Sequence, residues 1–130
     1  MKKLSLLFLS LFILLFSFDS NAQKFDKKIN ELSSNYESDI IELRHWFHQN
    51  AELSNREFKT AERIANELRK IGLEPQTGIA KTGVVAVLKG GKPGPVVALR
   101  ADIDGLPVKE RADLPWKSEM TGEYNGETVP

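Results

Sequence analysis

Apolar residues recur at steps of three and four along residues 26–50, and this spacing predicts an amphipathic helix. A second helix is predicted after Ser54-x-x-Glu57, a capping-box pattern in which each side chain can satisfy a free backbone N–H group. This helix should stop at Gly72, after the basic Arg69 and Lys70. The two apolar stripes are Ile29, Leu32, Tyr36, Ile40, Leu43 and Phe47, and then Phe58, Ala61, Ile64, Ala65, Leu68 and Ile71.

Two short apolar runs, residues 84–88 and 95–99, predict two strands joined by the Gly- and Pro-rich residues 90–94. Neither run alternates with polar residues, so both faces of these strands are expected to be buried. The joining loop lacks the spacing of a phosphate-binding loop. Residues 110–130 show no sustained period and are predicted to form a long loop. The pattern is that of an α/β chain, and two helices are too few to cover both faces of its strands.

The first 22 residues have the organisation of an export signal. Lys2 and Lys3 precede an apolar run, and small residues end at Ala22, after which cleavage is expected. A membrane anchor is the alternative, but serines interrupt the run, and a spanning helix needs about 20 apolar residues. No Cys follows the cut, which argues against a lipid anchor. We therefore expect residues 23–130 to be exported to the periplasm or the medium, with no stable membrane insertion.

Charge and cysteine content narrow the function further. The chain has 18 basic and 18 acidic residues, and removal of the signal takes away two lysines and Asp19, which leaves 16 basic and 17 acidic. Nucleic-acid binding usually relies on a basic face, so no nucleic-acid partner is expected. The chain has no cysteine, which excludes a disulfide framework in this exported chain.

Asp102 and Asp104 directly follow the second predicted strand. Open sheets place their sites beyond the carboxyl ends of strands, which favours a functional role for the pair. In a second interpretation, Asp102 pairs with Arg100 and Asp104 initiates the turn at Gly105. The spacing alone leaves the two interpretations about equally weighted, because D-x-D is a short motif.

His45 and His48 are three residues apart near the end of the first predicted helix, so they lie on one side of it. A metal pair is one interpretation. The structural one is favoured, because a helix C-terminus attracts His through its dipole and the intervening Trp46 and Phe47 indicate packing.

Three segments in this order resemble the aminoacylase-like metallo-amidohydrolases, which include hippurate hydrolases, N-acyl-amino-acid amidohydrolases and the hydrolases of indole-acetyl-amino-acid conjugates. The segments are Arg44-His45-Trp46-Phe47-His48-Gln49-Asn50-Ala51-Glu52-Leu53 with Glu57 and Thr60, then Gly83-Val84-Val85-Ala86, then Arg100-Ala101-Asp102-Ile103-Asp104-Gly105-Leu106-Pro107-Val108. The chain departs from the family pattern at Ala51, where Pro is usual, and at Ile103 and Gly105, which replace the commoner Met and Ala.

The resemblance implies a three-layer αβα catalytic domain of the zinc-peptidase type, of which residues 23–130 hold only two N-terminal helices and the first strands. It implies hydrolysis of the amide bond of N-acyl amino acids or dipeptide-like substrates with two divalent ions, which could be zinc, manganese, nickel or cobalt. Asp104 matches a residue that orients a ligand beside the metals, and Asp102 is expected near it without ligating. The family's ligands include an H-A-C-G-H-D motif that this chain lacks, so no residue here is assigned as a metal ligand. A homodimer would form through the family's lid domain.

Two other hypotheses stay open. The chain could be a small exported binding module without catalysis that derives from this fold. It could also be an incomplete gene product whose reading frame continues into the cysteine motif, which is the hypothesis we rank first. In that case the 130-residue chain should be inactive and bind no metal by itself.

Overall fold

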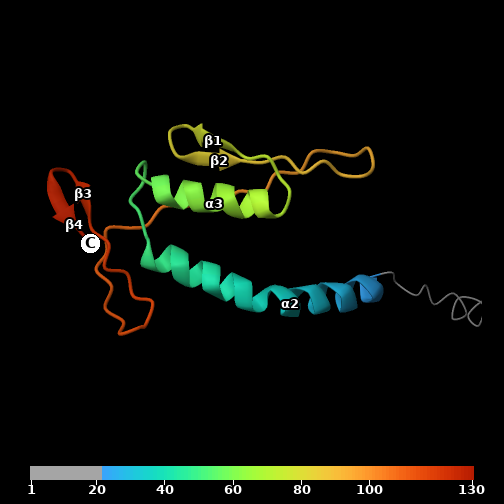
Figure 1. Ribbon diagram of the computed structural model, residues 1–130, viewed down its shortest axis with the longest axis horizontal. Coiled ribbons are helices and arrows are strands. Elements are labelled where there is room, and N and C mark those ends of the chain that lie inside the picture. Colours follow the sequence, from blue (N-terminus) through green and yellow to red (C-terminus); the bar gives the residue numbers. More distant parts are fainter. Residues whose placement is uncertain (1–21) are drawn as a thin grey trace, which may run out of the picture. The chain divides into compact units, whose positions relative to one another are not determined.

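The computed structural model describes residues 22–130 of the chain. These residues form α2 (Ala22–Gln49), α3 (Phe58–Lys70) and two antiparallel hairpins, β1 (Gln76–Ile79) with β2 (Gly83–Val85), and β3 (Gly122–Tyr124) with β4 (Glu127–Val129) (Figure 1). The chain divides into two compact units, Met1–Asp39 and Ile40–Pro130. The predicted export signal lies, except for Ala22, outside the described residues. Within residues 22–130, no helix has the length and apolar character needed to cross a membrane.

Both predicted helices are present. The first begins four residues earlier than expected and ends at Gln49 rather than at residue 50. The second ends as predicted, because Gly72 adopts a φ of +83° that favours glycine. The N–H groups of Gly72 and Leu73 then donate to the carbonyls of Arg69 and Leu68, at 2.9 and 3.0 Å. This is the Schellman arrangement, which satisfies the last free carbonyls of a helix.

The predicted capping box at the start of α3 is wrong. The helix begins at Phe58, and Glu57 at the N-cap makes no side-chain capping bond. The carboxylate of Glu52 caps the helix instead, because it accepts hydrogen bonds from the N–H groups of Lys59 at 3.2 Å and Thr60 at 2.8 Å. The bend before α3 carries Glu52 back over the helix end, and the spacing Ser54-x-x-Glu57 does not encode that bend.

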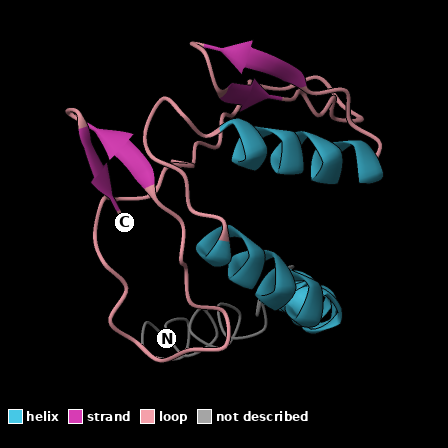
Figure 2. Cartoon of the chain, turned by 60° about the vertical axis from the view of Figure 1, so that its left-hand side comes forward, coloured by secondary structure: helices cyan, strands magenta, loops and turns pink. Residues whose placement is uncertain are grey.

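Glu57 instead ties α3 to the first hairpin. Its buried carboxylate accepts a hydrogen bond of 2.7 Å from the buried hydroxyl of Thr82, just before β2. Desolvation by burial acts to raise the pKa of Glu57, but the bonds from Thr82 and from nearby backbone amides outweigh it, so this pKa lies below the ordinary 4.5. Figure 2 shows the hairpin lying along α3.

The predicted strand at residues 95–99 is wrong, and β2 is shorter than the predicted run at 84–88. β2 pairs with β1, with Thr77 opposite Val84 and a bulge at Gly78, whose φ is +77°. A hairpin closed by residues 80–82 costs less loop entropy than a longer connection. Between β2 and β3, residues 22–130 contain no further strand, only an isolated bridge at Gly105.

The prediction that the apolar runs at residues 84–88 and 95–99 are buried on both faces is also wrong. Val96 and Leu99 are each 98% exposed, and Val87 and Leu88 are exposed as well. The buried apolar side chains of the described part are small in volume, apart from Leu53, and comprise Leu53, Ala61 and Ala65. Residues 86–88 and 96–99 are apolar, as in buried strands, but no other element of the described part of the chain packs over them.

The second hairpin corrects the prediction that residues 110–130 form one long loop. β3 and β4 pair with Glu123 opposite Thr128, and the turn between them is Asn125-Gly126. Both turn residues have positive φ, +52° and +81°. Asn-Gly is the preferred pair for such a two-residue hairpin turn, so this signal was present in the sequence and was missed.

We predict that Glu52→Ala weakens the start of α3. The loss of a capping carboxylate typically costs about 1 kcal/mol, so the amides of Lys59 and Thr60 should exchange with solvent roughly fivefold faster. Hydrogen exchange followed by NMR checks this. Glu62→Ala, at an exposed position of the same helix, is the control. Equal exchange rates in the Glu52 variant and the unaltered chain would contradict the capping role.

We predict that Thr82→Val raises the pKa of Glu57, because the valine keeps the shape of threonine and removes the hydroxyl donor. A folded-state pKa below 4.5 means that the contribution of Glu57 to stability is present above pH 4.5 and is lost as the pH falls through the lower folded value. NMR of the Glu57 carboxyl carbon across the acid range measures the shift. Thr77→Val, in β1 of the same hairpin, should leave it unchanged.

Candidate functional site

The segment that carries both aspartates is held by the loop between α2 and α3. The N–H group of Gly105 donates to the carbonyl of Glu52 at 2.6 Å, and Gly105 forms a parallel bridge with Leu53. The two backbones approach so closely that a β-carbon at position 105 would lie 3.0 Å from the β-carbon of Ala51. Glycine at position 105 therefore permits this contact, which fixes the position of the residue before it, Asp104.

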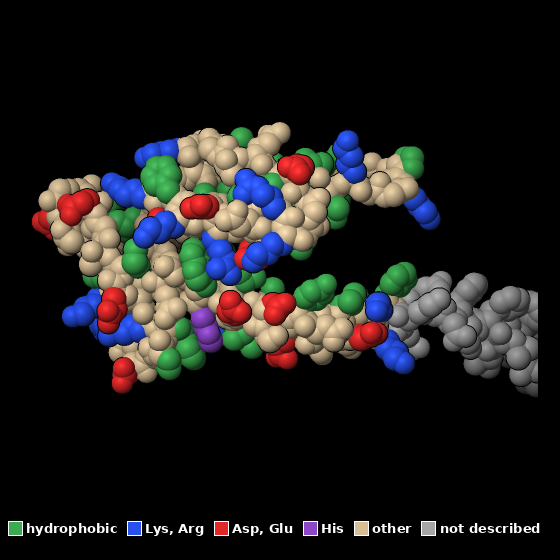
Figure 3. Space-filling model, viewed as in Figure 1, with side chains coloured by type: hydrophobic (Ala, Val, Ile, Leu, Met, Phe, Trp, Pro, Cys, Tyr) green, Lys and Arg blue, Asp and Glu red, His purple; other side chains and the backbone are tan. Residues whose placement is uncertain are grey.

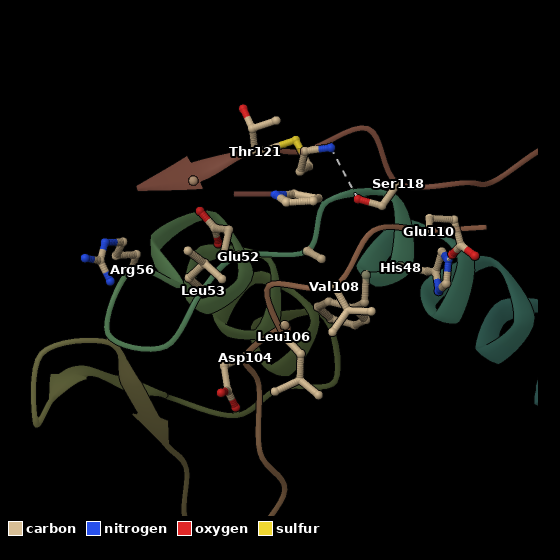
Figure 4. Close-up of a pocket in the computed structure, with 16 residues that line it drawn as sticks. His48, Glu52, Leu53, Arg56, Asp104, Leu106, Val108, Glu110, Ser118 and Thr121 are labelled. Atoms are coloured by element: carbon tan, nitrogen blue, oxygen red, sulfur yellow. Dashed lines mark hydrogen bonds and ion pairs between the residues drawn. The ribbon is translucent and has the colours of Figure 1, made fainter. Parts of the chain in front are cut away.

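Asp104 lies at the boundary of two pockets, of about 440 and 360 Å³, and lines both of them. Figure 4 shows it on the same segment as Leu106 and Val108, across from the loop that carries Glu52 and Leu53. Its side chain is exposed, and among residues 22–130 its carboxylate has no hydrogen-bond or ion-pair partner. The expected turn-initiating bond of Asp104 is thus not seen. A carboxylate in this position can accept a hydrogen bond from a ligand or from a ligand-bearing residue.

Asp102 follows the structural alternative considered for it. Its Oδ1 lies 2.6 Å from Nη2 of Arg100, and its side chain is 70% exposed. An ion pair this exposed contributes at most about 1 kcal/mol. Asp102 is therefore not a buried charge, although its place after an apolar run suggested that it would be one.

The two histidines have separate partners. The ring of His45 stacks on Trp116, with centroids 3.8 Å apart and an interplanar angle of 12°. Its Nε2 lies 2.9 Å from Nη2 of Arg44. Because a guanidinium can only donate, Nε2 of His45 must be the acceptor, and the neutral ring then carries its proton on Nδ1.

His48 contacts the segment that follows the aspartates. Its Nε2 lies 2.7 Å from Oε2 of Glu110, and it must donate because a carboxylate accepts. The pKa of Glu110 is lowered, first by the backbone N–H of Ala112 and then by His48. The contacts of both histidines are those expected of residues that pack α2 against later segments, in keeping with the structural interpretation.

The 440 Å³ pocket contains polar groups from three parts of the unit Ile40–Pro130. His48 comes from α2, Glu52 and Arg56 from the following loop, and Asp104 and Glu110 from the later segment. Within the described residues, no group of three or more His, Cys, Asp or Glu side chains is placed to hold a metal ion. The residues present therefore do not fit a complete metal centre.

Sequence reasoning missed the positioning roles of Glu52 and Glu110. Glu52 was part of a recognised motif, but its two tasks, capping α3 through the carboxylate and accepting the Gly105 N–H through the backbone, depend on a tertiary contact. The contact between Glu110 and His48 spans 62 residues of sequence and leaves no local pattern.

Comparison with known proteins identifies similar hydrolases, although no family model matches the chain. It is 46% identical over 84 residues to thermostable carboxypeptidase 2 of Saccharolobus solfataricus. The aligned segment covers 64% of this chain and 21% of that protein. It is 42% identical over 83 residues to hippurate hydrolase of Campylobacter jejuni, covering 64% and 22%. It is 42% identical over 89 residues to N-acetyl-L-cysteine deacetylase of Bacillus subtilis, covering 68% and 21%. The chain thus spans about a fifth of the length of these relatives.

A solved structure agrees with this. The YXEP protein of Bacillus subtilis, described as a dinuclear metal-binding peptidase from the M20 family, superposes with a TM-score of 0.62 at 38% identity. The match covers 67% of this chain and 24% of that protein, and it confirms the predicted α/β class as part of that peptidase fold. Over about two thirds of its length the chain is therefore similar to a segment of proteins named as hydrolases, and to a segment of an M20-family dinuclear metal-binding peptidase, in agreement with the resemblance that its motifs indicated.

Proposed function

We propose that this chain is part of an amidohydrolase that cleaves the amide bond of N-acyl amino acids or dipeptide-like conjugates. The observation that carries the proposal is the 42% identity to a hippurate hydrolase and to an N-acetyl-L-cysteine deacetylase, whose names both denote removal of an acyl group from an amino acid. The motif that holds the two aspartates supports it. Export to the periplasm or the medium is a further part of the proposal and rests on the N-terminal pattern alone.

In this proposal the segment positions a carboxylate. Glu52 links the start of α3 to Gly105, and Asp104 precedes Gly105 at the border of two pockets. With no partner among the described residues, the Asp104 carboxylate is available to orient a group of the catalytic centre. Asp102 would act from farther away, because Arg100 already engages it.

The cofactor would be two divalent ions, such as zinc, manganese, nickel or cobalt. The solved relative is described as dinuclear, which supports divalent metal binding at this coarser level. Because residues 22–130 supply no cluster of ligands, the ions would be held by a further part of a longer protein. The isolated chain would then be inactive.

A non-catalytic exported module is the competing function. The exposure of Val96 and Leu99 weighs against it, because a stand-alone domain does not usually leave an apolar, β-branched stretch uncovered. In a longer protein the same stretch could be buried as a central strand.

We predict that Asp104→Asn in the complete protein lowers turnover of an N-acyl amino acid at least about a hundredfold, since correct placement of a catalytic group can be worth that much. The thermal midpoint should change little, because the side chain is exposed and forms no hydrogen bond or ion pair in the described part. Asp113→Asn, which makes the same chemical change at an exposed position, is the control. Turnover close to that of the unaltered protein would contradict the role of Asp104.

We predict that the 130-residue chain binds zinc no more tightly than isolated surface carboxylates do. Isothermal titration with zinc chloride, with the complete protein as the positive control, measures this. Stoichiometric tight binding by the chain alone would show that its own residues form a metal site and would contradict the proposed division of ligands.

A further inference from the structure

The turn of the second hairpin places an asparagine directly before a glycine. Asn125 and Gly126 are both exposed, and both have positive φ, +52° and +81°. Glycine has no β-carbon, so its backbone nitrogen can approach the carboxamide carbon of the preceding asparagine without hindrance. The sequence contains a single Asn-Gly pair, and the reacting groups of that pair belong to two adjacent residues.

Neither of these two groups is engaged elsewhere. Within the described part of the chain, the carboxamide of Asn125 makes no hydrogen bond and the N–H group of Gly126 donates none. Hydroxide can therefore remove the proton of this N–H group. The flanking strands are three residues long. A two-stranded hairpin is at best marginally stable, so this turn can open and bring the nitrogen onto the carboxamide carbon.

Asn55 provides the contrast within the same chain. It is also exposed and has a φ of +62°, but it is followed by Arg56. The N–H group of Arg56 donates to the carbonyl of Leu53 at 2.9 Å, and its side chain crowds the nitrogen. The remaining asparagines of residues 22–130 lie within helices, where the following N–H group is hydrogen-bonded, or, like Asn50, hold the carboxamide in a hydrogen bond.

We propose that Asn125 is a modification site, at which the chain spontaneously converts asparagine to aspartate and isoaspartate. The backbone nitrogen of Gly126 loses its proton and bonds to Cγ of Asn125, and the side-chain amide leaves as ammonia. Water then opens the resulting cyclic imide. Opening at Cγ restores the original backbone and gives aspartate. Opening at the main-chain carbonyl routes the backbone through Cβ and Cγ and gives isoaspartate.

Both products add a negative charge to an acidic hairpin. Residues 118–130 contain three acidic residues and no basic one. Figure 3 shows acidic side chains on this hairpin, at the left of the view. Exposed charges of this kind interact weakly, so the added charge alone should leave the pairing of β3 with β4 in place.

Isoaspartate has a larger effect, because it lengthens the backbone of the turn by a methylene group. The two-residue turn holds Tyr124 opposite Glu127. At the other end of β3, a β-carbon at Gly122 would lie 2.8 Å from Cδ1 of Leu53, and both residues line the 440 Å³ pocket with Asp104. Isoaspartate should therefore loosen one wall of this pocket. Aspartate should not, because Asp-Gly also favours such a turn.

Incubation of the complete 130-residue chain in neutral buffer made with heavy-oxygen water tests the proposal. After proteolysis, the peptide that contains Asn125 should exchange its amide for an acid, with oxygen taken from the solvent. It should then separate into two products of equal mass, aspartate and isoaspartate. The peptide that contains Asn55 is the internal control and should convert at least roughly tenfold more slowly.

Asn125→Asp separates the effect of the charge from that of the longer backbone. In NMR spectra, the amide signals of residues 122–129 should be displaced in the isoaspartate form and stay close to their original positions in this variant. Displacement of the same size in both would overturn the effect assigned to the backbone.

Three results would overturn the modification site itself. They are an unchanged Asn125 peptide, equal conversion of the Asn125 and Asn55 peptides, and conversion to aspartate without isoaspartate. The last of these would show that water hydrolyses the side chain directly, without the attack by Gly126.

Discussion

The unit Ile40–Pro130 depends on the two contacts made by Glu52. The carboxylate of this residue satisfies the first free N–H groups of α3, and its carbonyl accepts the N–H group of Gly105. The start of α3 and a segment more than 40 residues farther along the chain are thereby joined at one point. Because Glu57 holds the same helix end to Thr82, the beginning of α3 is fixed to both the first hairpin and the aspartate-bearing segment.

These hydrogen bonds explain how the candidate site is held in position although few apolar side chains are buried. The apolar side chains buried in the described part are few, so most of the order near Asp104 comes from hydrogen bonds and aromatic contacts rather than from apolar packing. His45 stacked on Trp116 and His48 bound to Glu110 hold residues 110–118 against the end of α2. The outcome is a polar framework with an uncovered apolar stretch beside it.

Elements encoded by local chemistry could be predicted from the sequence. The stripe of α2, the stripe of α3 and the stop at Gly72 depend on residues a few positions apart, and each was found. The Asn125-Gly126 turn was equally local, but without flanking alternation its hairpin was missed. The strand expected at residues 95–99 failed for another reason, because β-branched residues form a strand only where a neighbouring strand exists to pair with them.

Part of the candidate site could also be predicted from local sequence. Asp102 and Asp104 could be selected from their place after an apolar run, and the family resemblance was confirmed. Which of the two is engaged could not be inferred, because the Arg100 pair and the Gly105 contact depend on the path of the backbone. Glu110 and His48 are in contact although α3 and the first hairpin lie between them in the sequence, and no spacing rule predicts such a contact.

The close approach at Gly105 brings two of the chain's departures from the family pattern into contact. Ala51 and Gly105 looked like unrelated replacements of Pro and Ala, yet a β-carbon at 105 would lie only 3.0 Å from that of Ala51. The two positions share one steric constraint. A side chain added at 105 would require the loop at 51 to shift by a few tenths of an ångström, so what position 105 accepts depends on the residue at position 51.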